Sequence, residues 1–244
     1  RRLDGYTEQV YEAGSYEENG VPHTINHRVT TVRSLMEYDV LNRLNYYEDR
    51  ITDDASPNLE TTVFFGAIRD AVTKEITHTA PTYDPLNRLL SYSEVRHELG
   101  TETDYPVISL DENNQEVPST TTISVDTYTV TARTGMSYDV DNNILGYTDE
   151  ITDSRNQKTI RTMSLIDYNS LKQMISYHEV ADSIIRPAGE GIPEISISTI
   201  TDRSLITYNP LGQMTSYRDD IVTITPNLEN PGIVSLISDK EVQW

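Results

Sequence analysis

The sequence predicts an all-β protein in which tandem antiparallel β-hairpins stack side by side into one continuous, coiling sheet, as a β-solenoid or an open, shell-like array. Three observations support this fold class. The chain contains 16 Tyr against 2 Phe and 1 Trp, and Tyr, Thr, Ile and Val are typical of strands. A ten-residue stretch that begins and ends with Tyr recurs along the chain. Between its copies Thr or Ser alternates with Ile or Val, as in EISISTI at 194–200, which indicates a sheet with one solvated face.

The recurring stretch is YDVLNRLNYY at 38–47, and related copies follow four more times. We expect both tyrosines of a copy to fill half-buried sheet positions that hold successive hairpins together. A row of tyrosines that stacks on sugars is the alternative. The first tyrosines of the copies are Tyr38, Tyr83, Tyr138, Tyr168 and Tyr208. The second tyrosines, nine residues later, are Tyr47, Tyr92, Tyr147, Tyr177 and Tyr217, and the opening RRLDGY adds Tyr6 to this set.

A three-residue loop at Val40-Leu41-Asn42 predicts the register of the first hairpin, because Tyr38 then faces Leu44. Asp or Asn follows each first tyrosine, and Asn or Gly occupies the position that needs a left-handed backbone, except at Lys172. The same register places opposite charges across from each other, which stabilises a hairpin by about 0.2–1 kcal/mol per pair. The predicted cross-strand pairs are Arg33 with Asp49, His78 with Glu94, Arg133 with Asp149, and Arg203 with Asp219, whereas the remaining copy has Met163 and Glu179.

The whole chain, 1–244, is predicted to be a single repeat array. A separate hairpin signal is Asn19-Gly20, which favours a tight two-residue turn. The chain opens partway through one copy, and Trp244 lies near the first-tyrosine position of another, so we expect a window on a longer array. The predicted hairpin motifs are a partial one at 1–10, then 33–51, 78–96, 133–151, 163–181 and 203–221, with 222–244 as the start of a further unit.

Composition narrows the classes of partner and chemistry. The 19 Lys and Arg against 39 Asp and Glu give a net charge of −20, which repels phosphate backbones and anionic lipids. We therefore expect no nucleic-acid partner and no membrane insertion. The absence of Cys excludes disulfides, thiolate nucleophiles and Cys-based metal sites.

No catalytic or cofactor site emerges from the residue patterns, and no enzyme activity is predicted. His23 and His27 have a spacing that could bind zinc on a helix, but the surrounding residues are typical of a strand. Acidic stretches at 52–58, 110–116 and 139–143 carry oxygen ligands of the kind that Ca²⁺ takes, without the spacing of an EF-hand. We expect these stretches to be solvated loops and no cofactor to bind, with weakly bound Ca²⁺ as the alternative.

The copies YDPLNRL at 83–89 and YNPLGQM at 208–214 resemble the YD repeat, the Tyr-Asp-x-x-Gly-Arg-Leu motif of Rhs-type proteins, toxin-complex shell components and teneurins. The resemblance covers roughly a quarter to a third of the chain; Gly212 alone keeps the glycine of the motif, and Arg43 and Arg88 keep its arginine. It implies extracellular or secreted hairpin repeats that in those families spiral into one long sheet closed around a cargo.

These observations together predict a non-catalytic extracellular structural repeat protein, a segment of a fibre, stalk or surface assembly. Its expected partner is itself, through further repeats or head-to-tail subunits, because both ends of such a sheet are open edges. Two alternatives are a fragment of a shell that encapsulates a toxin or enzyme, and a glycan-binding adhesin repeat.

Overall fold

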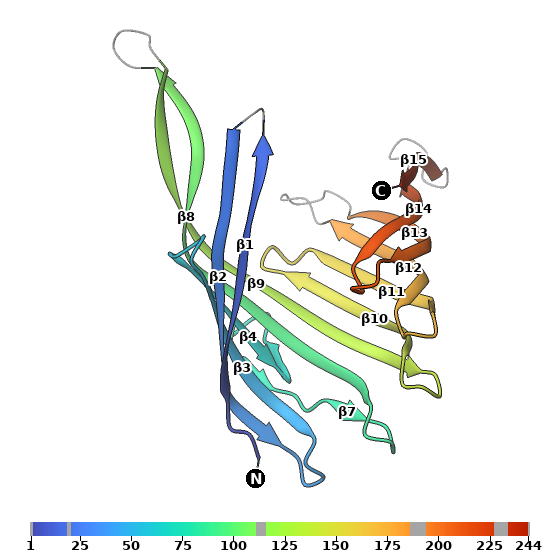
Figure 1. Ribbon diagram of the computed structural model, residues 1–244. Helices are drawn as coiled ribbons and strands as arrows, with labels where there is room; N and C mark the ends of the chain where they lie inside the picture. Colours follow the sequence, from blue (N-terminus) through green and yellow to red (C-terminus); the bar gives the residue numbers. More distant parts are fainter. Residues whose placement is uncertain (1, 19–20, 111–115, 186–193, 227–233, 244) are drawn as a thin grey trace. The chain divides into compact units, whose positions relative to one another are not determined.

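The computed structural model describes residues 2–18, 21–110, 116–185, 194–226 and 234–243, and these residues form strands, turns and loops without a helix. The all-β prediction is therefore confirmed. The strands, shown in Figure 1, are β1 (Tyr6–Glu18), β2 (Val21–Tyr38), β3 (Leu44–Asp53), β4 (Leu59–Phe65), β5 (Ala67–Arg69), β6 (Ile76–His78), β7 (Thr82–Tyr83), β8 (Leu89–Leu110), β9 (Glu116–Tyr138), β10 (Ile144–Asp153), β11 (Lys158–Tyr168), β12 (Met174–Ile185), β13 (Ile195–Tyr208), β14 (Met214–Pro226) and β15 (Val234–Gln243).

Twelve strands follow one another in the hydrogen-bond order β1-β2-β3-β4-β8-β9-β10-β11-β12-β13-β14-β15. The path is open among the described strands, with β1 and β15 at its ends, and its assigned pairings are antiparallel. Strand β7 pairs with β8, whereas β5 and β6 form a separate two-stranded sheet. The antiparallel hairpins that the sequence predicts are therefore present, with one interruption between β4 and β8.

The residues cluster into two compact units, where the sequence predicts one array. The first contains Arg1–Ala80 and Glu94–Thr129, and the second contains Pro81–Ser93 and Val130–Trp244. Strands β8 and β9 contribute residues to both units. The strands from β10 to β14, coloured from yellow to red in Figure 1, lie in the second unit and follow one another as consecutive hairpins.

Each of the five repeated turns is a three-residue loop of the predicted type. In the first, the Asp39 N–H donates to the Arg43 carbonyl at 2.8 Å, the Asn42 N–H donates to the Asp39 carbonyl at 3.0 Å, and Tyr38 faces Leu44. The residue that closes each loop has a left-handed backbone, including Lys172, which the turn chemistry does not predict. These residues are Asn42 (φ 66°), Asn87 (62°), Asn142 (66°), Lys172 (61°) and Gly212 (78°).

A bulge lies between the charged pair and the first tyrosine of these hairpins. In β2 and β3 the register passes from Ser34 opposite Glu48 to Glu37 opposite Tyr46, which places one extra residue on β2. The next step, to Tyr38 opposite Leu44, places one extra residue on β3 and restores the register. The pairings of β11 with β12 and of β13 with β14 shift in the same way. Three positions before the first tyrosine, the bulge holds a left-handed residue in four hairpins: Leu35 (φ 53°), Gly135 (66°), Leu165 (52°) and Leu205 (55°).

Leu165→Gly is expected to raise the free energy of unfolding by about 1 kcal/mol, because a left-handed backbone strains a residue with a Cβ by about 1–2 kcal/mol. The Leu165 side chain is 77% exposed, so its removal loses little burial. Denaturant unfolding measures the change, and Gly135→Leu is the matched reverse substitution with an expected loss of similar size. A lower stability of Leu165→Gly would show that the exposed side chain makes a contact worth more than the strain.

The core of each unit is small and lies close to the repeated residues. In the second unit the position two residues before the first tyrosine is buried, with 7% of Met136, 5% of Ile166 and 6% of Ile206 exposed. In the first unit Val63, Phe65, Ala67 and Val95 are buried together with Tyr46. Among the few buried polar residues are three aspartates, which belong to the predicted cross-strand pairs: Asp49, Asp149 and Asp219.

Candidate functional site

The predicted arginine and aspartate pairs meet between tyrosines in three nearly identical arrangements, which we call Arg–Tyr clusters. Each contains one arginine, its aspartate, the second tyrosine of the same hairpin and the second tyrosine of the hairpin before it. The clusters are Tyr6, Arg33, Tyr47 and Asp49; then Tyr92, Arg133, Tyr147 and Asp149; then Tyr177, Arg203, Tyr217 and Asp219.

The first cluster shows how the register brings these side chains together. Arg33 lies directly opposite Asp49 on β3 and directly opposite Tyr6 on β1. Its Nε donates to Asp49 Oδ1 at 2.7 Å and its Nη2 donates to Asp49 Oδ2 at 2.6 Å. The guanidinium carbon lies 3.6 Å from the Tyr47 ring centroid and 5.3 Å from the Tyr6 ring centroid. Arg33, on β2, therefore contacts both neighbouring strands, β1 and β3.

The other two clusters repeat this geometry. Arg133 makes the same two hydrogen bonds to Asp149 at 2.7 Å each, and its guanidinium carbon lies 3.7 Å from the Tyr147 ring centroid. Arg203 binds Asp219 with both distances at 2.6 Å and lies 3.8 Å from the Tyr217 ring centroid. The tyrosines of the preceding hairpins lie further away, at 5.6 Å for Tyr92 and 5.4 Å for Tyr177.

Burial makes these ion pairs different from ordinary surface pairs. Only 4% of Asp149 and 4% of Asp219 are exposed. The hydrogen bonds to Asp149 raise the pKa of the Arg133 guanidinium above its ordinary value, which outweighs the opposing effect of burial. A planar guanidinium can bind a carboxylate through two parallel hydrogen bonds and lie over an aromatic ring at the same time. Each cluster therefore holds two neighbouring strands together and also favours the one register in which the arginine and the aspartate lie opposite each other.

The hairpin that carries Met163 in place of the arginine keeps the same register without the charge. Met163 lies opposite Tyr147 on β10 and opposite Glu179 on β12, and 7% of it is exposed. The carboxylate of Glu179 lies 3.6 Å from the Arg161 Nε instead. The apolar side chain thus fills the space that an arginine occupies in the three clusters.

The predicted pair of His78 with Glu94 is wrong. His78 lies in β6 opposite Ala67, its ring stacks on Tyr46 with centroids 3.8 Å apart, and its Nδ1 lies 3.6 Å from the Glu37 carboxylate. Glu94 lies opposite Phe65 on β4. The hairpin predicted at 78–96 therefore forms only next to its turn, where β7 pairs with β8, and His78 belongs to a different strand pair.

An inserted hairpin causes this difference. Residues from Gly66 to Thr79 leave the sheet as the β5–β6 hairpin, and the Thr79 N–H donates to the Gly66 carbonyl at 2.8 Å to close it. Phe65 takes the place that arginine has elsewhere, opposite Tyr47 and stacked on its ring with centroids 4.9 Å apart. The β-branched and aromatic residues from 61 to 65, which end at Gly66, are the sequence signal that could have revealed this strand.

The first tyrosines join successive hairpins through a hydrogen bond that the sequence does not predict. Tyr138 donates its hydroxyl to the Leu89 carbonyl at 2.6 Å, at the start of the preceding hairpin's second strand. The same bond recurs from Tyr38 to Leu3 at 3.0 Å, from Tyr168 to Ile144 at 2.9 Å and from Tyr208 to Met174 at 2.7 Å. Tyr83 lies in β7, half-buried and opposite Leu89.

Tyr138→Phe is expected to lower the free energy of unfolding by about 1 kcal/mol, because the Leu89 carbonyl loses its donor while the ring stays in place. Denaturant unfolding measures the loss. Tyr11→Phe is the matched control, since the Tyr11 hydroxyl donates only to the exposed Gln9 side chain at 2.9 Å and 64% of Tyr11 is exposed. Equal effects of the two substitutions would contradict a special role for the hydroxyl that joins hairpins.

A polar network fixes each turn. Asp39 Oδ1 accepts hydrogen bonds from the Leu41 and Arg43 backbone N–H groups, both at 2.8 Å, and Asp39 Oδ2 accepts one from Arg43 Nε at 2.6 Å. These hydrogen bonds lower the pKa of Asp39, and the bond from the Arg43 backbone N–H has the largest effect. In the turn that has Asn169 in place of the aspartate, Gln173 takes the place of the arginine. There Asn169 Nδ2 donates to Gln173 Oε1 at 2.8 Å.

Burial also raises the pKa of Tyr47 from 10.0 to about 12. A raised phenol pKa means that the neutral form is favoured in the folded state, so this contribution to stability is complete below about pH 10 and is lost as the pH rises toward 12. We expect the free energy of unfolding to fall over that range, and to fall less in Tyr47→Phe. Denaturant unfolding at several alkaline pH values tests this, and equal losses in the two proteins would contradict it.

The described residues that could bind a metal are engaged in other contacts. His27 lies 3.2 Å from the Glu12 carboxylate and 3.9 Å from that of Asp53, while the His23 side chain lies outside the described residues. Asp54 accepts a hydrogen bond from the Arg28 N–H at 2.7 Å. Within the described ranges no three His, Asp or Glu side chains gather closely enough to hold a metal ion. Positions 111–115, most of the second acidic stretch, lie outside them.

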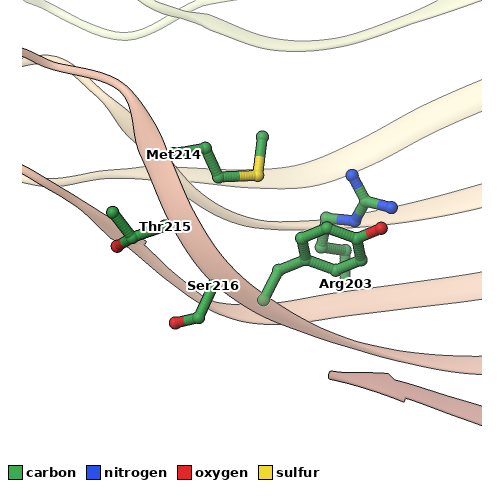
Figure 2. A pocket seen from close by; sticks show the side chains of 5 residues that line it. Arg203, Met214, Thr215 and Ser216 are labelled. Carbon is green, nitrogen blue, oxygen red and sulfur yellow. The ribbon is translucent and has the colours of Figure 1, made fainter. Parts of the chain in front are cut away.

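One surface hollow of about 310 Å³ adjoins the third Arg–Tyr cluster. It is lined by Arg203 of β13 and by Met214, Thr215, Ser216 and Tyr217 of β14. In Figure 2 the Met214 side chain extends toward Arg203, whereas the Thr215 and Ser216 hydroxyls point away from it. The Met214 thioether, and not the Thr215 or Ser216 hydroxyl, is therefore turned toward Arg203.

Comparison with protein families, with curated proteins and with solved structures gave no match to this chain. The described residues include no helix that is long and apolar enough to cross a membrane.

Proposed function

We propose that this chain is a non-catalytic, extracellular structural repeat protein, a segment of a fibre, stalk or surface assembly. The observation that carries the proposal is the threefold recurrence of the Arg–Tyr cluster with nearly the same distances. The arginines and aspartates that could bind or transform a ligand are used to hold neighbouring hairpins to each other.

The contacts favour an array in which each hairpin depends mainly on its neighbours. An arginine such as Arg203 contacts Tyr177 of the preceding hairpin and Asp219 of its own. The hydroxyl of Tyr208 adds a second bond to the preceding hairpin. Stability in such arrays is close to a sum of unit and nearest-neighbour contributions, so hairpins can be added without redesign. The proposed array is one continuous, coiling sheet.

The turns and the tyrosines also support a relationship to YD-repeat proteins, which we include in the proposal together with its extracellular location. The resembling residues have concrete roles in the fold: Tyr208 joins hairpins and Asn209 organises its turn. A YD-repeat shell around a toxin or enzyme would use the same hairpins. In a glycan-binding adhesin the tyrosine faces would be free for sugars, whereas Arg203 lies over the Tyr217 ring.

Negative-stain electron microscopy of the protein from its native source tests the proposal. We expect long uniform filaments or stalks, whereas compact hollow particles would support the enclosing shell and overturn the fibre. A glycan array is the second measurement, and saturable binding of one sugar that is lost in Tyr217→Ala would favour the adhesin. The matched control for the array is Tyr11→Ala, at an exposed position outside the three Arg–Tyr clusters.

A further inference from the structure

Three hairpins each carry two exposed leucines, one in the bulge and one in the turn, which we call a leucine pair. The members lie three positions before and three positions after the first tyrosine, and between 60% and 83% of each side chain is exposed. In the hairpin of Tyr138 both members are missing together, since Gly135 and Asp141 take their places. The leucine pairs are Leu35 with Leu41, Leu165 with Leu171, and Leu205 with Leu211.

The bulge leucines are unfavourable for the stability of the hairpin. Leu35, Leu165 and Leu205 have left-handed backbones with φ between 52° and 55°, a conformation that strains a residue with a Cβ and leaves glycine unstrained. Gly135 has the same conformation in its own hairpin, with φ 66°. Because the leucine side chains are mostly exposed, burial within the chain offsets little of the strain. Strain that recurs without such a gain points to a contact outside the chain.

Two of the leucine pairs lie side by side at one edge of the sheet. Leu165 and Leu171 belong to the β11–β12 hairpin, Leu205 and Leu211 belong to the β13–β14 hairpin, and β12 pairs with β13. The hydroxyl of Tyr208 donates to the Met174 carbonyl, so the two turns lie at the same edge. Two strand spacings, roughly 10 Å, separate neighbouring hairpins. Four exposed leucines are therefore presented together.

This edge differs in charge from the rest of the chain. The segments 164–174 and 204–214, which contain the two leucine pairs, have one acid, Asp167, and one base, Lys172, and so no net charge. The whole chain has a net charge of −20, which opposes close approach of two copies through its acidic surfaces. The leucine pairs therefore lie where a second copy is repelled least.

We propose that the leucine pairs of the β11–β12 and β13–β14 hairpins dock against the same leucine pairs of a second copy of the chain. A second copy has the same spacing between its hairpins, so both pairs can be matched at once. A cationic partner would find Asp167 as the one acid of these two segments, balanced by Lys172. The inference rests on the proposed function, because it names the surface through which neighbouring arrays associate.

Sedimentation velocity of the 244-residue chain over a range of protein concentrations tests the proposal. We expect reversible self-association that becomes tighter with added salt, because salt screens the repulsion between two acidic chains. Leu165→Gly combined with Leu205→Gly should raise the dissociation constant more than about tenfold. These substitutions remove backbone strain, so denaturant unfolding should show no loss of stability and the weaker association cannot result from unfolding.

The turn members and an exposed valine provide the controls. Leu171→Ser combined with Leu211→Ser should weaken the association as well, since 75% and 83% of these side chains are exposed. Val72→Ser is the matched control, because Val72 lies in the β5–β6 turn outside the leucine pairs and 87% of it is exposed. Its association should equal that of the unchanged chain. A chain that stays monomeric, or association that the leucine substitutions leave unchanged, would overturn the proposal.

Other occupants give different results. Association that salt weakens would show that charged groups form the contact, and leucine-dependent binding to phosphatidylcholine vesicles by a monomeric chain would identify a lipid surface instead. Either outcome would overturn the second copy as the partner. Native filaments together with association that does not depend on the leucines would leave the proposed function standing and remove this inference alone. Native hollow particles together with leucine-dependent association would overturn the fibre and keep the contact.

Discussion

Asp149→Ala is expected to lower the free energy of unfolding by about 3 kcal/mol, because removing one partner leaves the other charge of a buried ion pair uncompensated. Asp149 is 4% exposed and accepts both hydrogen bonds of Arg133. Denaturant unfolding of the whole chain measures the loss. A loss below about 1 kcal/mol, which is the range of surface pairs, would mean that the cluster does not hold the strands together.

The chain provides the controls for this prediction. Met163 shows that an apolar side chain can occupy the arginine position, so Arg133→Met combined with Asp149→Ala should be more stable than Asp149→Ala alone. The exposed pair of Arg50 and Glu60, with Nε and Oε1 3.0 Å apart, is the surface comparison. Glu60→Ala should change the free energy of unfolding by at most about 0.5 kcal/mol.

Gly66→Ala is expected to have the second large effect, a loss of about 4 kcal/mol. A Cβ at this position would lie 2.0 Å from the Asn45 carbonyl oxygen and 3.1 Å from its carbon. Both atoms belong to the backbone of β3, so neither can turn aside as a flexible side chain could. Denaturant unfolding measures the loss, and circular dichroism shows whether the strands persist.

Gly135→Ala separates the clash from the backbone strain. Gly135 has φ +66° and Gly66 has φ +70°, so the left-handed strain of an added Cβ is nearly the same at both positions. A Cβ at Gly135 meets nothing within 4 Å, and the expected loss is therefore only about 1 kcal/mol. Losses of equal size at the two glycines would show that conformation alone, and not the close approach of β3, decides the effect.

Local chemistry accounts for what the sequence predicts well. The three-residue loops, the left-handed residues that close them and the pairing of Arg33 with Asp49 all lie within 16 residues of one another along the chain. Their spacing is therefore fixed whatever the rest of the molecule does. The same holds for Arg203 and Asp219, which the structure also brings together.

The parts that the sequence does not predict depend on insertions and on contacts between hairpins. The excursion from Gly66 to Thr79 separates Phe65 from Tyr83, so counting back from the tyrosine reaches His78 instead. A leucine with a left-handed backbone, such as Leu165, has no turn signature because propensity argues against it. The carbonyl that Tyr138 reaches belongs to Leu89, 49 residues earlier, and the motif itself does not indicate that acceptor.

The turn network has a consequence for how the copies can diverge. Asp39 accepts from Arg43, whereas Asn169 donates to Gln173, so an asparagine facing an arginine would bring two donors together. A single codon change from Asp to Asn at residue 39 is therefore disfavoured until residue 43 has changed as well. Recombination that exchanges whole ten-residue blocks carries both partners at once, so unequal crossing-over between copies preserves the turns where stepwise drift would not.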